Sequence, residues 1–359
     1  MSATAEHSRS LRANAIPFGR DIMTRISAPV RWMMPALIAV ASLLLVTACG
    51  GGGGDSNAAQ EGKGTLAIAF SNAVPQVEKV PTILASEQLE DEGYEIKLIW
   101  LQSSEDPVQA VVRGDAQIGT ANTSTLFGAT AQGAPVKAIS AQNSPSYAMV
   151  VPPNVTTPEG LDGLRIGIHA QVSATALYTN LLLKDYPNVK PNLVVVPGSA
   201  NRVQALIAGE LDASVVQLSD LQVLEEKAPG KFHVLYNYAT SMNDIVDSAI
   251  FTSDKFLKQN PDAVNDFLDA LVAQQKRIKE DPQVLIDGIV ANVPDVTPEQ
   301  AKGFADTYLE SNVWPEDANF TDESINATLD AVKEFGGLDG VPTREGCCTT
   351  EPLDGVLHK

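Results

Sequence analysis

Small polar side chains at the ends of predicted strands are the residues of this chain best suited to do chemistry. Their hydroxyl and amide groups donate and accept hydrogen bonds, and none is a strong nucleophile on its own. Gathered in loops, such side chains predict the binding of a small solute rather than its transformation. The candidate ligand-binding residues are Ser71, Asn72, Asn122, Thr123, Ser124, Tyr147, Gln171, Ser173, Thr175, Ser199, Asn201, Arg202 and Gln217.

A structural role competes with ligand binding at many of these positions. Ser71, Thr123, Ser173 and Ser199 stand at predicted helix starts, where Ser and Thr commonly act as N-caps. Both interpretations stay open for each of them. Asn122 is a stronger candidate for a solute contact, as is Gln171, because a side-chain amide donates and accepts at once.

Two larger side chains predict what kind of solute is bound. Arg202 is the one base in the polar loops of the second half of the chain, so it is the candidate countercharge for an anion. The alternative is a solvated surface arginine. Helix N-termini in the same loops favour negative charge as well. Tyr147 either stacks on a planar solute or fills the interior.

Composition and motifs argue against other classes of protein. With 25 Lys and Arg against 44 Asp and Glu the net charge is −19, which argues against a nucleic-acid partner. The four His and three Cys lack zinc-site spacing, and the chain has no Gly-x-Ser-x-Gly, His-Glu-x-x-His or phosphate-loop motif. His169 and His233 are the only histidines in the predicted folded body. We therefore predict no metal, no cofactor and no catalytic residue.

The elements that must position the polar loops occur twice. Residues 101–115 and 196–210 share the pattern Val-Gln-Ala, three residues, Gly, then Asp or Glu. In each copy an apolar run ends in a Ser-containing turn, and a short helix and a further apolar strand follow. Such alternation predicts an α/β fold with two lobes, each a mainly parallel sheet flanked by helices. The strands are predicted at 65–70, 95–101, 116–120, 136–141, 165–168, 193–196, 213–217 and 232–235, and the helices between them at 81–92, 107–113, 123–132, 172–184, 200–208 and 220–227.

Two extended segments, 146–153 and 247–253, are predicted to cross between the lobes. They divide the chain into a first part of lobe 1 (64–147), lobe 2 (148–248) and a return to lobe 1 (249–340), followed by a polar tail (341–359). The return contains four helices with one apolar face each. They are predicted at 261–279, 282–291, 298–310 and 322–335, packed mainly on lobe 1.

The first 48 residues have the organisation of a lipoprotein signal peptide. Arg25 and Arg31 precede an apolar run over 32–46, and small residues precede Cys49. The stretch Leu-Val-Thr-Ala-Cys resembles a bacterial lipobox, so we expect a lipid on Cys49 that anchors the protein to the cell membrane on its extracytoplasmic side. Residues 49–63, rich in Gly, form a flexible tether. A start at Met23 would leave a leader of ordinary length.

A family resemblance is carried by residues 108–119 (VQAVVRGDAQIG) and 133–139 (GAPVKAI). These stretches resemble the nitrate/sulfonate/taurine branch of ABC-transporter solute-binding lipoproteins, which includes receptors for thiamine-type pyrimidines. The resemblance implies a type II periplasmic-binding-protein fold, lobes that close on a solute, and delivery to ABC permease subunits. We predict a small organic anion of sulfonate or carboxylate type, with a neutral heteroaromatic, such as a pyrimidine or flavin-type vitamin precursor, as the alternative. The rival classes are an enzyme on the same fold and a sensory lipoprotein that transports nothing.

Cys347 and Cys348 lie in the predicted tail. An exported protein meets an oxidising environment, so the pair can form a vicinal disulfide, link two chains or remain as thiols. The related pyrimidine-synthase enzymes carry a Cys-rich loop, but inside the core of the fold, so their chemistry is not transferred to this pair.

Overall fold

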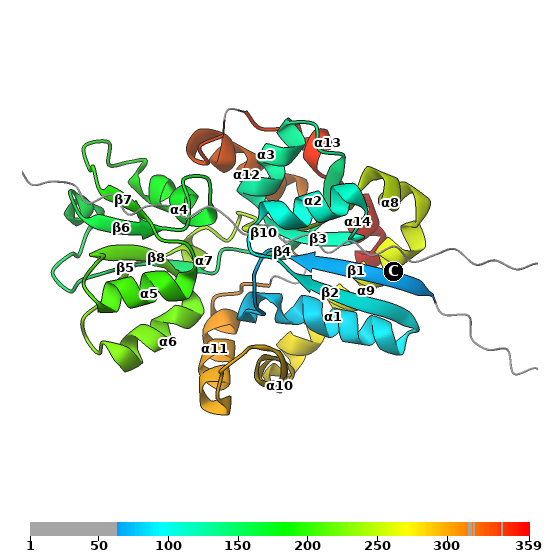
Figure 1. The fold of residues 1–359 in the computed structure, drawn as a ribbon, viewed down its shortest axis with the longest axis horizontal. Helices are drawn as coiled ribbons and strands as arrows, with labels where there is room; N and C mark the ends of the chain where they lie inside the picture. Colours follow the sequence, from blue (N-terminus) through cyan, green and yellow to red (C-terminus); the bar gives the residue numbers. More distant parts are fainter. Residues whose placement is uncertain (1–62, 315–317, 319, 339) are drawn as a thin grey trace, which may run out of the picture. The chain divides into compact units, whose positions relative to one another are not determined.

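Two five-stranded sheets organise the computed structural model, which describes residues 63–314, 318, 320–338 and 340–359 (Figure 1). The predicted leader, Met23, Cys49 and all but the last residue of the tether lie outside the described residues. The described residues all belong to one compact unit. No helix within the described ranges is long and apolar enough to cross a membrane.

The sheet of lobe 1 has the strand order β2-β1-β3-β10-β4. Its first two pairings, β1 with β2 and β1 with β3, are parallel, whereas β10 is antiparallel to both β3 and β4. Consequently the carboxyl ends of β3 and β4 meet the start of β10, where Ser248 pairs with Asn122 and Asn143. The strands are β1 Gly64–Phe70, β2 Tyr94–Trp100, β3 Ile118–Asn122, β4 Val136–Asn143 and β10 Ser248–Ser253.

The sheet of lobe 2 repeats this plan, with the order β7-β6-β8-β5-β9. Strand β6 is parallel to β7 and β8, and β5 runs antiparallel to β8 and β9. Tyr147, the first residue of β5, pairs with Gln217, the last residue of β8. The strands are β5 Tyr147–Val151, β6 Arg165–Ile168, β7 Asn192–Val195, β8 Ala213–Gln217 and β9 His233–Asn237. The predicted α/β fold of two mainly parallel sheets is therefore confirmed.

Close contact between the central strands of lobe 1 depends on one glycine. A Cβ at Gly119 of β3 would lie 2.3 Å from the Phe251 ring of the neighbouring strand β10. Phe251 is fully buried and belongs to the main apolar core, which surrounds these strands. Glycine at 119 therefore makes room for a large core side chain where the returning strand enters the sheet.

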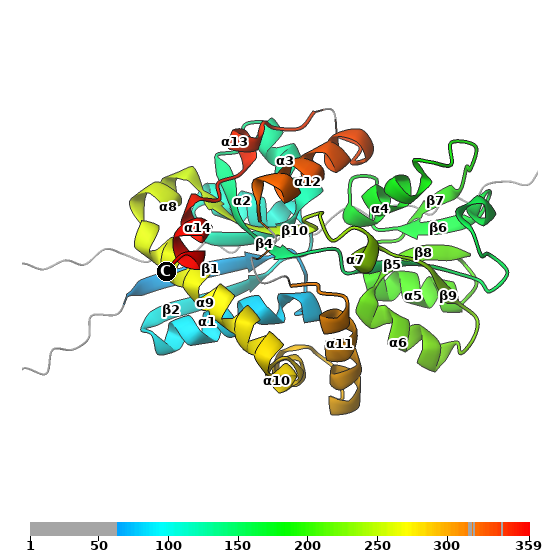
Figure 2. The ribbon, with the colours of Figure 1, turned by 180° about the vertical axis from the view of Figure 1, so that it is seen from behind.

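Helices cover both sheets, and a further series of helices follows the last strand, β10 (Figures 1 and 2). Lobe 1 has the 3-10 turn η1 Val77–Lys79 and helices α1 Val80–Asp91, α2 Glu105–Arg113 and α3 Thr123–Ala131. Lobe 2 has η2 Pro158–Leu161, α4 Ala174–Leu183, α5 Ser199–Ile207, α6 Leu218–Lys227 and α7 Tyr238–Ser241. The return has α8 Asp254–Gln259, α9 Pro261–Glu280, α10 Pro282–Asn292, α11 Pro298–Glu310, α12 Asp322–Phe335, α13 Arg344–Cys347 and α14 Glu351–Leu357.

The connections between the lobes are shorter than predicted, because both extended segments are strands. The outward connection is residues 144–146, since β5 begins at Tyr147 in the sheet of lobe 2. The return connection is residues 242–247, since β10 begins at Ser248 in the sheet of lobe 1. The predicted lobe boundaries after residues 147 and 248 fall one residue inside these strands.

The helices of the return contact both lobes. Helix α9 packs on α1 in lobe 1, as predicted, but α11 contacts α6 and α12 contacts α4 in lobe 2. Gln300 Nε2 of α11 donates to Glu226 Oε2 at 3.3 Å. Asn180 Nδ2 of α4 donates to the carbonyl oxygen of Phe335 at 3.1 Å. The last two long helices thus bridge the lobes, which the predicted packing on lobe 1 did not include.

The end of the chain packs on lobe 1 instead of forming a polar tail. Cys347 and Cys348 form a vicinal disulfide, and both are buried. Cys348 makes a parallel bridge to Ala138 of β4, and Leu353 of α14 is also buried. The sequence left the state of the cysteine pair open, and charged residues in the segment concealed these apolar contacts.

Candidate functional site

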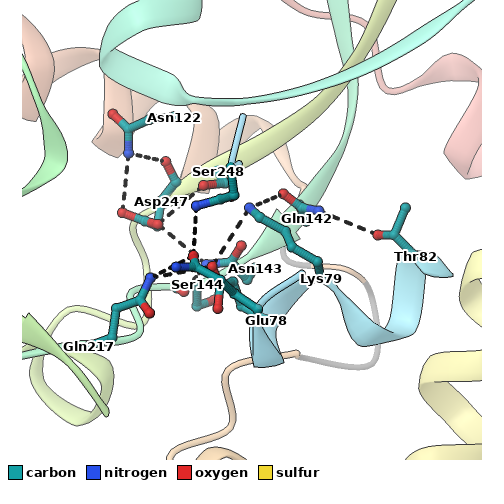
Figure 3. A network of polar contacts seen from close by, with 12 residues as sticks. Glu78, Lys79, Thr82, Asn122, Gln142, Asn143, Ser144, Gln217, Asp247 and Ser248 are labelled. Carbon is teal, nitrogen blue, oxygen red and sulfur yellow. Dashed lines mark hydrogen bonds and ion pairs between the residues drawn. The ribbon is translucent and has the colours of Figure 1, made fainter. Parts of the chain in front are cut away.

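Polar side chains from both lobes, most of them buried, meet where the connections leave the sheets (Figure 3). They come from the loop after β1, from η1, from the carboxyl ends of β3, β4 and β8, from helix α4 and from the return connection. We call this set the interlobe network. It consists of Asn72, Gln76, Glu78, Lys79, Asn122, Gln142, Asn143, Tyr178, Gln217 and Asp247.

Gln217 joins the two lobes directly. Its Nε2 lies 3.1 Å from Oε1 of Gln76 and 3.4 Å from Oε1 of Glu78, both in lobe 1. Asn72 Nδ2 donates to the same Gln76 oxygen at 2.6 Å. Because Gln217 ends β8, its position follows from the sheet of lobe 2, and the contact forms only when the lobes face each other.

Asp247 is the acceptor at the centre of the network. The hydroxyl of Tyr178, from lobe 2, donates to its carboxylate at 2.7 Å, and Nδ2 of Asn143, from lobe 1, lies 3.3 Å away. Asn122 Nδ2 donates to the main-chain carbonyl of Asp247 at 2.9 Å. Burial raises the pKa of the Asp247 carboxyl, and the hydrogen bond from Tyr178 and the charge of Lys79 oppose that shift.

Glu78 and Lys79 are neighbouring charged residues that are both buried, with side chains 5% and 3% exposed. Lys79 Nζ donates to Gln142 Oε1 at 2.7 Å and lies 4.0 Å from Glu78 Oε1. Burial raises the pKa of Glu78 and lowers the pKa of Lys79, and the opposite charge of each counteracts the shift of the other. Paired buried charges of this kind are costly to remove singly, since the partner is left uncompensated.

Arg202 is buried next to the network rather than solvated, with 2% of the residue exposed. Its guanidinium donates to the carbonyl oxygens of Val215 at 3.2 Å and Val196 at 3.3 Å, and to Ser199 Oγ at 3.4 Å. The Ser199 hydroxyl in turn donates to Asp220. Burial lowers the pKa of Arg202, whereas the charge of Asp220 acts in the opposite direction. The alternative of a solvated surface arginine is therefore wrong, and its role as an anion's countercharge stays a prediction.

A row of tyrosine rings borders the network in lobe 2. The ring of Tyr147 lies 5.6 Å from that of Tyr178, which lies 4.9 Å from that of Tyr238. Tyr147 is partly exposed, whereas the other two rings are fully buried. Burial, and next the charge of Asp247, raises the pKa of Tyr147, so its hydroxyl stays protonated and available to donate a hydrogen bond.

The structure brings some of the predicted site residues together and leaves others apart. Asn72, Asn122 and Gln217 belong to the interlobe network, and Thr123 and Tyr147 contact it. Ser199 and Arg202 form the adjoining cluster with Asp220. The remaining residues are Ser71, half-buried; Ser124, whose buried Oγ has no hydrogen-bond partner in the described ranges; Ser173, the N-cap of α4; Thr175, which accepts a hydrogen bond from the His169 N–H; and the exposed Gln171 and Asn201.

Sequence reasoning missed the charged and aromatic members of the network. Glu78, Lys79 and Asp247 were not proposed because charged residues are normally solvated. Asn143 lies in a polar run at the end of β4, the kind of position that did reveal Asn122, and it could have been found by the same rule. Tyr178 lies inside a helix that reads as core, and the sequence holds no signal that its hydroxyl reaches Asp247.

Two α/β lobes with mixed sheets, joined by two short connections and bridged by C-terminal helices, define the fold of type II periplasmic binding proteins. Residues 80–284 match the family model described as NMT1/THI5 like, and the chain belongs to that family. The predicted family resemblance is thereby confirmed. A comparison with curated protein sequences gave no match.

Solved structures share the fold at low sequence identity. A ligand-binding component of an ABC-type import system from Staphylococcus aureus is 13% identical, with a TM-score of 0.67 over 82% of this chain and 99% of that chain. The alkanesulfonate-binding protein SsuA from Xanthomonas axonopodis pv. citri is 17% identical, with a TM-score of 0.60 over 78% and 95%. The periplasmic nitrate-binding protein NrtA from Synechocystis PCC 6803 is 12% identical, with a TM-score of 0.61 over 82% and 88%.

Proposed function

We propose that the protein is the extracytoplasmic solute-binding component of an ABC importer, which captures a small solute between its lobes and delivers it to permease subunits. The interlobe network carries this proposal, because both lobes contribute buried polar groups to one place beside the connections. Solved neighbours of the same fold are described as a ligand-binding component of an ABC-type import system and as an alkanesulfonate-binding protein, and this supports the assignment.

Contacts across the lobes support a closing mechanism. Gln217 meets Glu78 across the boundary, and α11 and α12 contact helices of lobe 2. A solute that contacts both lobes stabilises their closed arrangement, since it binds the closed form more tightly than the open one. The closed form is then the one that a permease recognises.

The rival proposal of an enzyme lacks support among the described residues. His169 Nδ1 accepts a hydrogen bond from the Gly198 N–H at 3.1 Å, and His233 Nε2 lies 2.8 Å from the Val155 carbonyl oxygen. Both rings therefore contact backbone rather than a nucleophilic side chain, as general base catalysis would require. Binding without chemical change is the function that these contacts favour.

Of the two predicted solute classes, the contacts favour the heteroaromatic over the sulfonate or carboxylate anion. An anion relies on Arg202, whose guanidinium is already directed at two carbonyl oxygens and Ser199. A planar solute gains from the partly exposed ring of Tyr147, which stands at the end of a row of three tyrosine rings tilted against one another. The predicted organic anion remains the second candidate because Arg202 is next to the network.

The test is a thermal-shift screen of the mature protein across pyrimidines, flavins, aromatic acids, sulfonates and nitrate. A solute that binds only the folded protein at a hundred times its Kd stabilises it by about 2.7 kcal/mol and raises Tm. The Gln217→Ala variant should lose most of this shift, with Gln204→Ala, exposed on α5, as the control. A shift that survives Gln217→Ala unchanged would contradict binding between the lobes.

We further propose that a lipid on Cys49 holds the protein at the membrane through the tether of residues 49–63. This part of the proposal rests on the lipobox-like sequence alone. Cys49→Ser should move the protein from the membrane fraction to the soluble fraction of the native host, as judged by immunoblotting. Retention of Cys49→Ser in the membrane fraction would refute lipid anchoring at this residue.

A further inference from the structure

Three buried oxygen atoms of the interlobe network have no hydrogen-bond donor within the described ranges. They are Oδ1 of Asn72, Oε2 of Glu78 and Oδ1 of Asn143. Asn143 is 1% exposed and Glu78 is 4% exposed, so solvent reaches them little. Buried acceptors are normally paired, and several unpaired ones in a single hydrogen-bonded network indicate a group that supplies donors.

The orientation of the Asn143 amide follows from its partners. Its Nδ2 lies 2.8 Å from the Ser144 carbonyl oxygen and 3.3 Å from a carboxylate oxygen of Asp247. Both partners are acceptors, so the atom between them must be the NH₂ group. Oδ1 therefore points the other way as an acceptor, and a flipped amide would set oxygen against two oxygens.

The orientation of the Asn72 amide follows from a chain of contacts that starts at Glu78. The Glu78 carboxylate accepts from Gln217, which fixes the Gln217 atom as Nε2. The Gln76 atom that accepts from this nitrogen is then Oε1, and the Asn72 atom that donates to it is Nδ2. Oδ1 of Asn72 is left as an acceptor, like Oδ1 of Asn143 and Oε2 of Glu78.

The charges around these oxygens point in the same direction. Three buried carboxyl groups, Glu78, Asp220 and Asp247, lie near two buried bases, Lys79 and Arg202, in the part of the chain that the structure describes. Both bases already donate to protein oxygens. A negative solute would add to this excess of carboxyl groups, whereas a positive one would reduce it.

We propose that the interlobe site selects a solute whose bound edge carries a protonated nitrogen group, an ammonium or amidinium, with N–H bonds directed at Glu78 Oε2, Asn72 Oδ1 and Asn143 Oδ1. This inference rests on the proposed solute-binding function and names the class of solute. Tyr147, the partly exposed member of the tyrosine row, would then contact the remainder of the solute, which favours a ring attached to that nitrogen group.

The test uses three probes of one shape and different charge: benzamidinium, benzamide and benzoate, titrated into the mature protein by calorimetry. Benzamidinium should bind at least tenfold more tightly than benzamide, a difference of about 1.4 kcal/mol, and benzoate should not bind measurably. Glu78→Gln keeps the shape of the side chain and removes its charge. It should weaken benzamidinium binding at least tenfold, while Glu87→Gln, exposed on the following helix α1, should leave it unchanged.

Four outcomes would overturn the inference. Benzoate binding at least as tightly as benzamidinium would do so, and so would benzamidinium binding that is unaffected by Glu78→Gln in a protein that keeps its Tm. A third outcome is that none of the three probes binds, but an anion from the thermal-shift screen binds and Gln217→Ala abolishes that binding. In that case the inferred solute class is wrong, and the proposed solute-binding function is retained. If no solute binds at all, both fail.

Discussion

Replacement of Asp247 by alanine tests whether the interlobe network holds the two lobes together. The variant removes the acceptor of the Tyr178 hydroxyl, 2.7 Å away, and of Asn143 Nδ2, 3.3 Å away. A hydrogen bond to a charged group contributes about 1.5–3 kcal/mol, and a buried donor left without its partner also costs free energy. Removing one partner of a buried charged network typically costs about 3–5 kcal/mol.

We expect Asp247→Ala to lower the free energy of unfolding by about 3 kcal/mol. At about 2–4 °C per kcal/mol for a chain of this size, Tm should fall by about 6–12 °C. Differential scanning calorimetry of the mature protein measures this directly. Asp244→Ala is the matched control, since Asp244 is exposed on the same return connection.

A double-mutant cycle separates the hydrogen bond between Tyr178 and Asp247 from the other effects of replacing Asp247. Tyr178→Phe removes only the hydroxyl, and the pair of substitutions should cost less than the sum of the two by about 1 kcal/mol or more. Strict additivity, or a Tm of Asp247→Ala within about 2 °C of the unsubstituted protein, would refute the assignment of Asp247 as the central acceptor.

Three further changes have defined outcomes. Because burial raises the pKa of Glu78 above its ordinary 4.5, the folded state holds that proton more firmly than the unfolded state, and stability falls as pH rises from 4.5 through the raised value. Glu78→Gln should flatten this fall in a series of Tm measurements against pH. Gly119→Ala should destabilise the protein by about 1–3 kcal/mol, measured by urea denaturation, because its Cβ meets the Phe251 ring, and Phe251→Leu should restore part of the loss. Arg202→Met should cost about 2 kcal/mol in the same assay, since the carbonyl oxygens of Val196 and Val215 each lose one donor, whereas the exposed Arg113→Met should cost little.

The sequence predicted helices best where capping residues mark their ends. Helices α11 and α12 begin and end at the predicted residues, each after a threonine that caps the first turn and completes a capping box. Strand β3 was predicted two residues early, because the apolar run begins at Ala116 whereas the strand begins at Ile118. Strand boundaries depend on pairing with distant strands, here β1 and β10, and this is not contained in the local pattern.

Only those residues of the candidate site that lie at the ends of strands could be predicted from the sequence. Asn122 and Gln217 were found because ligands of α/β sheets bind beyond the carboxyl ends of strands. Glu78 and Asp247 were missed because their burial requires residues from the other part of the chain, Gln217 and Tyr178, to cover them. No local property distinguishes these carboxylates from the many exposed ones.

The position of β10 between β3 and β4 constrains the order in which the two lobes fold during synthesis. Strand β4 pairs only with β10 in the described sheet, and β10 lies beyond all of lobe 2 in sequence. As the chain emerges from its amino end, β4 therefore has no partner until about a hundred more residues have appeared. Lobe 2 is one continuous segment and has everything it needs for its own sheet in that interval. We therefore expect lobe 2 to fold first. Its folding then brings β10 back to lobe 1, where it pairs with β3 and β4.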